Sequence, residues 1–121
     1  MNNEKRVEAL KMGVVNFKSL ADDSLSKFKE GLETNPDYAF RWGDDAVYSS
    51  QMLLVCSLVN SFLESNNNDV EALHFYLTER VVVLSRYDES STSVLSNYAK
   101  RMYLKALAMV LRNVASCVAK S

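Results

Sequence analysis

The chain has 121 residues, which is enough for one domain to bury its own core without metal or disulfide support. It is 48% apolar and 24% charged, as soluble globular domains are, and its formal charge of -1 gives no overall attraction to nucleic acid or to an anionic membrane. Three glycines and one proline are too few for the turns of a β-rich domain, so we expect a single all-α domain over residues 1–121.

The first predicted helix covers residues 4–32. Its apolar residues recur at spacings of three and four and form one stripe: Val7, Leu10, Val14, Phe17, Ala21, Leu25, Phe28 and Leu32. Gly13 lies inside this helix and should cost about 1 kcal/mol relative to alanine. Asp22 and Asp23 are both suitable N-caps for a second helical piece, so one continuous helix and two collinear helices both fit the sequence. Gly31 is the expected end.

The stretch "ETNPDYAFRWG" separates this helix from the next. Asn35 followed by Pro36 favours a turn or a helix start. We expect a short extra helical turn around residues 36–42, ended by Gly43. Its aromatic side chains are expected to fold over one end of the core: Tyr38, Phe40 and Trp42.

The second long helix is predicted to run from a cap at Asp44 or Asp45 to about Glu64. Residues 46–63 carry no charge, and eighteen such residues approach the length of a membrane span. The segment contains four serines and two amide side chains, and no cluster of Lys or Arg flanks it, so a lone span is not expected. We expect a deeply buried bundle helix whose serines let a neighbouring helix approach closely.

Two further helices complete the chain. Asp69 is the expected N-cap of a helix over residues 70–86, with its main apolar stripe at Val70, Leu73, Leu77, Val81 and Leu84. Ser90 or Ser91 is expected to open the last helix, which reaches about residue 118. The stripe of that helix comprises Leu104, Leu107, Leu111, Val114 and Val118.

Four amphipathic helices joined by short loops predict an antiparallel four-helix bundle. In that bundle Leu58 and Leu107 are expected to be core residues. Truncation of either to alanine should then cost roughly 2–5 kcal/mol.

The one histidine tests the case for a metal site. Glu71 and His74 have the Glu-x-x-His spacing that di-iron bundles use on two helices, together with a Glu from each of two others. The chain has only one such motif, and residues 46–63 offer no carboxylate. Cys56 and Cys117 lie on apolar helix faces without zinc-ligand spacing. We expect no metal or other cofactor, and two reduced, mostly buried thiols.

Enzymatic activity is not expected either. One histidine and no glycine-rich phosphate loop leave no set of nucleophile, base and orienting group. His74 falls at the edge of its helix stripe, so we expect a boundary residue bonded to Glu71 or Thr78. The alternative is phosphotransfer through His74, because histidine phosphotransfer domains are four-helix bundles of about this length with one exposed histidine. Those domains usually place a lysine shortly after the histidine, whereas this chain has none there and carries Glu79 nearby.

The helix over residues 70–86 has a second apolar patch. Phe75 and Val82 are seven residues apart, on the side opposite the main stripe, and are flanked by Glu79 and Arg86. Two interpretations stay open at this point. The helix is buried on two sides within its own chain, or the patch is a protein interface, most simply that of an isologous homodimer.

The last helix has a basic face. Arg101, Lys105 and Arg112 share it with Tyr98, and residues 91–121 contain no acid. It is either a solvated face, offset by the helix dipole and by acids of the first or third helix, or a surface for an anionic partner. An acidic protein fits better than nucleic acid, because the acidic segment 22–45 would repel a long polyanion.

We therefore expect a small, non-enzymatic protein-binding module that acts as adaptor, regulator or inhibitor and associates with itself. Nucleic-acid binding through the last helix and phosphotransfer through His74 are the alternatives. No small-molecule substrate or membrane partner is indicated. The opening "MNNEKRVEAL" is charged and polar, so we expect no secretory signal and a cytoplasmic protein.

Overall fold

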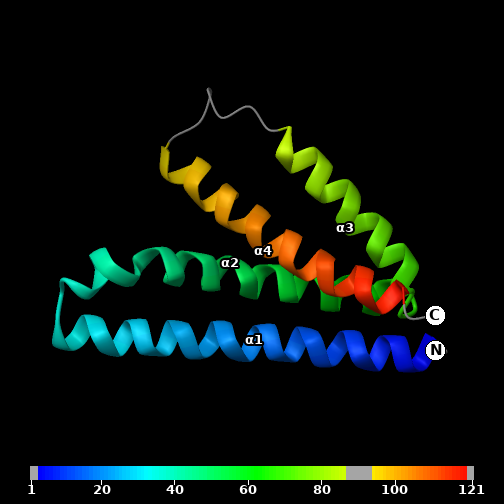
Figure 1. Cartoon of the computed structure of the whole chain (residues 1–121), viewed down its shortest axis with the longest axis horizontal. Helices are drawn as coiled ribbons and strands as arrows, with labels where there is room; N and C mark the ends of the chain where they lie inside the picture. The colour runs from blue at the N-terminus through cyan, green and yellow to red at the C-terminus, as the bar shows by residue number, and fades with distance from the viewer. Residues whose placement is uncertain (1–2, 87–93, 120–121) are drawn as a thin grey trace.

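The computed structural model of the chain describes residues 3–86 and 94–119. It contains four helices: α1 (Asn3–Thr34), α2 (Tyr38–Ser65), α3 (Val70–Ser85) and α4 (Val94–Ala119). No strand occurs in these two ranges, so the predicted all-α helical bundle is confirmed. The antiparallel helices α1 and α2 lie side by side, α4 packs obliquely on α2, and α3 packs on α4 (Figure 1).

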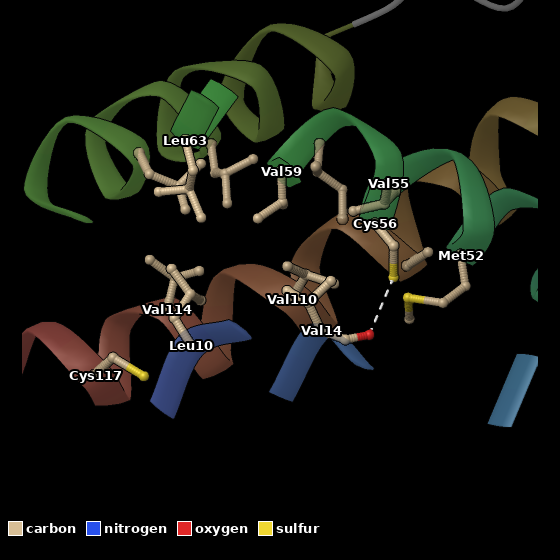
Figure 2. Close-up of a cluster of buried hydrophobic side chains, with 14 of the residues drawn as sticks. Leu10, Val14, Met52, Val55, Cys56, Val59, Leu63, Val110, Val114 and Cys117 are labelled. Atoms are coloured by element: carbon tan, nitrogen blue, oxygen red, sulfur yellow. Dashed lines mark hydrogen bonds between the residues drawn. The ribbon is translucent and has the colours of Figure 1, made fainter. Parts of the chain in front are cut away.

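The core lies where the inner faces of all four helices meet (Figure 2). Its fully buried leucines and valines are Leu10, Val55, Val59, Leu63, Val70, Leu73, Leu77, Leu107, Val110 and Val114. Leu107 is therefore a core residue, as predicted. Leu58 is only partly buried at the edge of the core, so its predicted place is wrong. The buried line of α2 passes through the neighbouring Val59, and one residue along a helix turns the side chain by about 100°.

Both cysteines belong to this core as free, buried thiols, in agreement with the sequence. The Cys56 Sγ lies 3.8 Å from the backbone carbonyl oxygen of Val14, to which it donates a weak hydrogen bond (Figure 2). Burial raises the pKa of the Cys56 thiol. The thiol therefore behaves as a small apolar group rather than a nucleophile.

The first helix is one piece of 32 residues, so neither Asp22 nor Asp23 restarts it. Asp23 instead forms an ion pair with Lys27 one turn later, at 3.2 Å. The predicted end at Gly31 is wrong, because α1 continues to Thr34. The carbonyl of Gly31 accepts bonds from the Asn35 backbone N–H at 2.9 Å and from the Thr34 hydroxyl at 3.1 Å, which closes the last turn.

The predicted extra turn around residues 36–42 is not a separate element. It is the first part of α2, which passes through Gly43 without a break and leaves Asp44 and Asp45 inside the helix. The turn before it is made by Asn35, whose Oδ1 accepts the backbone N–H of Asp37 at 3.1 Å. Gly43 costs only about 1 kcal/mol in a helix interior, less than the packing of α2 along α1 supplies.

Of the three aromatic residues expected over one end of the core, only Trp42 has a described side chain; those of Tyr38 and Phe40 lie outside the described part. Trp42 is exposed and lies outside the buried core. With Leu20 and Phe28 of α1 it lines an open hollow of about 280 Å³ between α1 and the start of α2. Trp42 therefore lines the edge of this hollow and does not cover the end of the core.

The serine face of α2 is also different from the expectation. Ser49 is buried, but Ser50, Ser57 and Ser61 are exposed, together with Leu54. Within residues 3–86 and 94–119 this uncharged face meets solvent rather than a neighbouring helix. By length and composition alone, Arg41–Ser65 and Asn97–Ala119 would each suffice to cross a membrane, a test that core helices of bundles also pass.

The short connection from α2 to α3 has the predicted cap. Asn67 and Asn68 adopt left-handed backbone angles, with φ of 53° and 57°, which asparagine tolerates better than most residues. Asp69 then caps α3, because its Oδ1 accepts the Ala72 backbone N–H at 3.0 Å. The predicted start of the last helix at Ser90 or Ser91 lies outside the described residues.

Candidate protein-binding surface on α3

The outer face of α3 is an exposed apolar surface. The side chains of Phe75, Val82 and Val83 are 65%, 40% and 60% exposed, while Leu73 and Leu77 on the inner face are fully buried. In the described part of the chain the patch is therefore open to solvent, which favours the second of the two interpretations, a protein interface. Val83 was not singled out from the sequence, although it follows Phe75 and Glu79 at helical spacings of eight and four.

These side chains border a shallow groove of about 420 Å³. Its lining comes from α3 alone: Phe75, Tyr76, Thr78, Glu79, Arg80, Val82 and Val83. Tyr76 is held by stacking on Phe62 of α2, with ring centroids 4.9 Å apart and planes 22° from parallel. The predicted flanking charges, Glu79 and Arg86, are both exposed; Glu79 lies within the groove lining, and Arg86 follows the last residue of α3.

Arg80 lies at the inner border of the groove, between α3 and α4. Its Nε is buried without a hydrogen-bond partner among the described residues. Burial raises the pKa of Tyr103 on α4, and the nearby Arg80 charge acts in the opposite direction. The Arg80 guanidinium therefore lies between the apolar side chains of this surface and Tyr103 of α4.

His74 is a partly buried boundary residue, as predicted, but its expected partners are engaged elsewhere. The Thr78 hydroxyl donates to the backbone carbonyl of His74 at 2.8 Å, rather than to the imidazole. The Glu71 carboxylate lies 3.6 Å from Nη1 of Arg6. Within residues 3–86 and 94–119, no group of three or more His, Cys, Asp or Glu side chains is placed to hold a metal ion.

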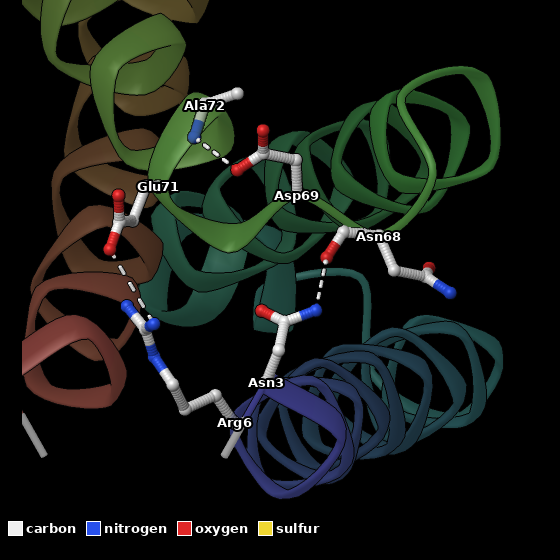
Figure 3. Close-up of polar contacts among 6 residues, drawn as sticks. All are labelled: Asn3, Arg6, Asn68, Asp69, Glu71 and Ala72. Carbon is white, nitrogen blue, oxygen red and sulfur yellow. Dashed lines mark hydrogen bonds and ion pairs between the residues drawn. The ribbon is translucent and has the colours of Figure 1, made fainter. Parts of the chain in front are cut away.

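The partner of Glu71 was missed from the sequence. Arg6 lies in the first turn of α1, next to Val7, and is only 8% exposed. Its ion pair with Glu71 connects α1 to the start of α3 (Figure 3). Asn3 adds a second contact, in which its Nδ2 donates to the Asn68 carbonyl at 3.5 Å. The sequence pattern around Arg6 resembles that of any exposed charge beside an apolar stripe, so it gives no signal of this burial.

The predicted basic face of α4 is exposed at Arg101, Lys105 and Arg112. Tyr98 is held differently, because its hydroxyl donates to the Asp44 carboxylate of α2. That hydrogen bond is the main reason why the pKa of Tyr98 is raised, with burial second. An acid of α2 therefore contacts this face at Tyr98.

The chain matches no protein-family model, and no curated protein or solved structure shows significant similarity to it.

Proposed function

We propose that the protein is a small, non-enzymatic protein-binding module that works in the cytoplasm as an adaptor, regulator or inhibitor. Its binding surface is the outer face of α3. The observation that carries the proposal is the exposure of Phe75 and, two turns later, of Val82 and Val83 on a helix whose opposite face is buried at Val70, Leu73 and Leu77.

The composition of this face supports a protein partner. Fully burying one side chain of this kind is worth roughly 1.5–3 kcal/mol, so three neighbouring ones favour association strongly. The face combines exposed apolar side chains with exposed charges, here Glu79 between Phe75 and Val82, and Arg86 one turn after Val82, and protein interfaces likewise combine apolar and polar groups. The adjoining groove makes the surface concave enough to receive a helix or a loop of a partner.

The two alternatives receive less support. For nucleic-acid binding through α4, the Asp44 carboxylate lies on the same face as Arg101 and would repel a phosphate. For phosphotransfer, His74 is partly buried and is followed one turn later by Thr78 and Glu79, neither of which stabilises a phosphoryl group.

The test compares two valine substitutions of the same chemistry. Val82→Glu places a carboxylate in the centre of the proposed surface. Val15→Glu places one on α1, at a valine that is 64% exposed and far from α3 along the chain. Both variants should keep the helical circular dichroism and the unfolding midpoint of the wild type to within a small shift, because both positions are exposed and neither belongs to the buried core.

Affinity capture from the source cell then separates the two. Partners of the α3 surface should be retained by the wild type and Val15→Glu and lost by Val82→Glu. If both variants retain the same partners, the outer face of α3 is not the binding surface. If Val82→Glu unfolds the protein, the patch belongs to the chain's own core, and the proposal also fails.

A further inference from the structure

We infer that the hollow between α1 and the start of α2 binds an arginine side chain presented by a basic segment of another protein. This surface is separate from the outer face of α3, so the inference does not rest on the proposed function. The hollow lies towards the turn that joins α1 to α2, at the end of the molecule opposite the start of α1 (Figure 1). Its lining combines aromatic side chains with carboxylates, and both kinds of group attract a guanidinium.

The aromatic wall of the hollow comes from both helices. Trp42 of α2 is 42% exposed, so part of its indole meets solvent, and the half-buried Phe28 of α1 lines the same hollow with Leu20. The space of about 280 Å³ has room for the end of one long side chain. Among aromatic side chains tryptophan attracts a cation best, and a planar guanidinium also stacks on its ring. The wall therefore favours arginine over lysine.

Asp45 supplies a carboxylate beside this wall. It follows Trp42 by three residues on α2, lines the hollow, and forms no ion pair with any residue in the described part of the chain. Its neighbour Asp44 is engaged elsewhere, because it accepts the hydroxyl of Tyr98 on α4. Asp45 can therefore accept hydrogen bonds from a guanidinium that lies against the indole.

A second carboxylate in the hollow already contacts a cation. Asp23 of α1 is paired with Lys27 at 3.2 Å, and both residues line the hollow. The pair is exposed, at 64% for the Asp23 side chain and 71% for that of Lys27, and exposed pairs of this kind are weak. A guanidinium of a partner can therefore replace the ammonium of Lys27 at this carboxylate.

The surface around the hollow selects a basic partner. Residues 22–45, which comprise the end of α1, the turn and the start of α2, hold seven acids and three bases. This excess of negative charge attracts the other bases of a basic protein segment and repels nucleic acid or an acidic segment. Because these charges are exposed, binding should be weak and should fall as salt is added.

The indole of Trp42 can report binding directly, because it is the only tryptophan of the chain. An acetylated peptide of alternating arginine and glycine is titrated into the whole protein at low salt. The fluorescence emission of Trp42 should change until it saturates. The same peptide with citrulline in place of arginine keeps the shape of the side chain without its charge, and it should leave the emission unchanged.

A matched pair of charge removals tests the place of binding. Asp45→Asn removes a carboxylate of the hollow and should raise the dissociation constant about threefold. Glu33→Gln removes the same charge from the same acidic segment, at an exposed position that does not line the hollow, and should raise it less than about twofold.

Two further variants test the other groups of the hollow. Lys27→Ala removes the competing ammonium and should lower the dissociation constant about twofold. Trp42→Ala, followed by isothermal titration calorimetry, should raise it about threefold. Circular dichroism of every variant checks that the helices are retained.

The outcomes are distinct. Saturable binding of the arginine peptide that Asp45→Asn and Trp42→Ala weaken more than Glu33→Gln does supports the inference. Absence of saturable binding, or equal binding of the citrulline peptide, overturns it. Equal weakening by Asp45→Asn and Glu33→Gln shows attraction by the general charge of the segment, which overturns the hollow as the site. Spermine bound as tightly as the peptide shows a site for free polyamines, which overturns the protein partner.

Discussion

Replacement of Gly13 by alanine should have opposite effects on stability with and without the side chain of Asn113. Gly13 lies in the interior of α1, where α4 crosses it. A Cβ atom on Gly13 would lie 2.7 Å from Oδ1 of Asn113 and 3.2 Å from its Cγ and Nδ2. The first distance is too short for unbonded atoms and the other two are tight, so the asparagine would have to move or the helices would have to separate.

The expected magnitude follows from two opposing effects. Alanine is better than glycine in a helix interior by about 1 kcal/mol. Overpacking a close helix contact costs roughly 1–3 kcal/mol. Gly13→Ala should therefore be neutral to about 2 kcal/mol destabilising in the wild-type background. Once Asn113 is alanine the contact is absent, and the same substitution should stabilise the protein by about 1 kcal/mol.

Asn113→Ala has a benefit of its own. The Oδ1 atom of Asn113 is buried with no hydrogen-bond partner in the described part of the chain, and such an atom costs roughly 1–3 kcal/mol. The double variant should consequently exceed the wild type in stability. The measurement is urea unfolding of all four proteins, followed by far-ultraviolet circular dichroism. If Gly13→Ala has the same effect in both backgrounds to within about 0.5 kcal/mol, the two residues are not in contact and the reasoning fails.

Three further predictions follow from the described burial. Leu107→Ala should lower the free energy of unfolding by roughly 2–5 kcal/mol and Leu58→Ala by clearly less, because only the Leu107 side chain is fully buried. Equal losses in urea titrations would contradict the face of α2 that is described as buried. The His74→Gln variant should have the same far-ultraviolet circular dichroism spectrum and the same thermal unfolding midpoint as the wild type. Wild-type protein incubated with kinases of its source cell should carry no acid-labile phosphate. A stable phosphohistidine would falsify the non-enzymatic proposal. Cys56 and Cys117 should react with a thiol reagent at pH 8 far more slowly than a free cysteine, since both are buried and the pKa of the Cys56 thiol is raised. Labelling should become fast when the protein is unfolded. Rapid labelling of the native protein would show that the core is open to the reagent.

The sequence alone predicted the features that depend on neighbours within a few turns. The all-α fold and the buried stripe at Leu73 and Leu77 follow from apolar spacing, which any helix converts into a face. The Asp69 cap follows from a side chain that reaches a backbone N–H three residues away. Helical spacing likewise placed Phe75 and Val82 opposite the stripe, but it left open whether the chain itself covers them, and their exposure was decided by the tertiary structure.

Helix boundaries were predicted less well. Gly31 and Gly43 were taken as helix ends, yet α1 and α2 continue past them. A glycine changes the local preference by only about 1 kcal/mol, and the contact between two long helices outweighs that. The sequence states the local preference but not the length over which the two helices touch.

Contacts between distant segments were decided only by the tertiary structure. Arg6 is buried because the start of α3 meets α1 beside it, and Tyr98 donates to an acid that is 54 residues away in the sequence. The exposure of Ser50, Ser57 and Ser61 depends likewise on the side of α2 against which α3 and α4 pack. Periodicity fixes the direction in which each side chain leaves its own helix, but the relative placement of the helices depends on the sum of many small packing energies, and no single residue pattern encodes that sum.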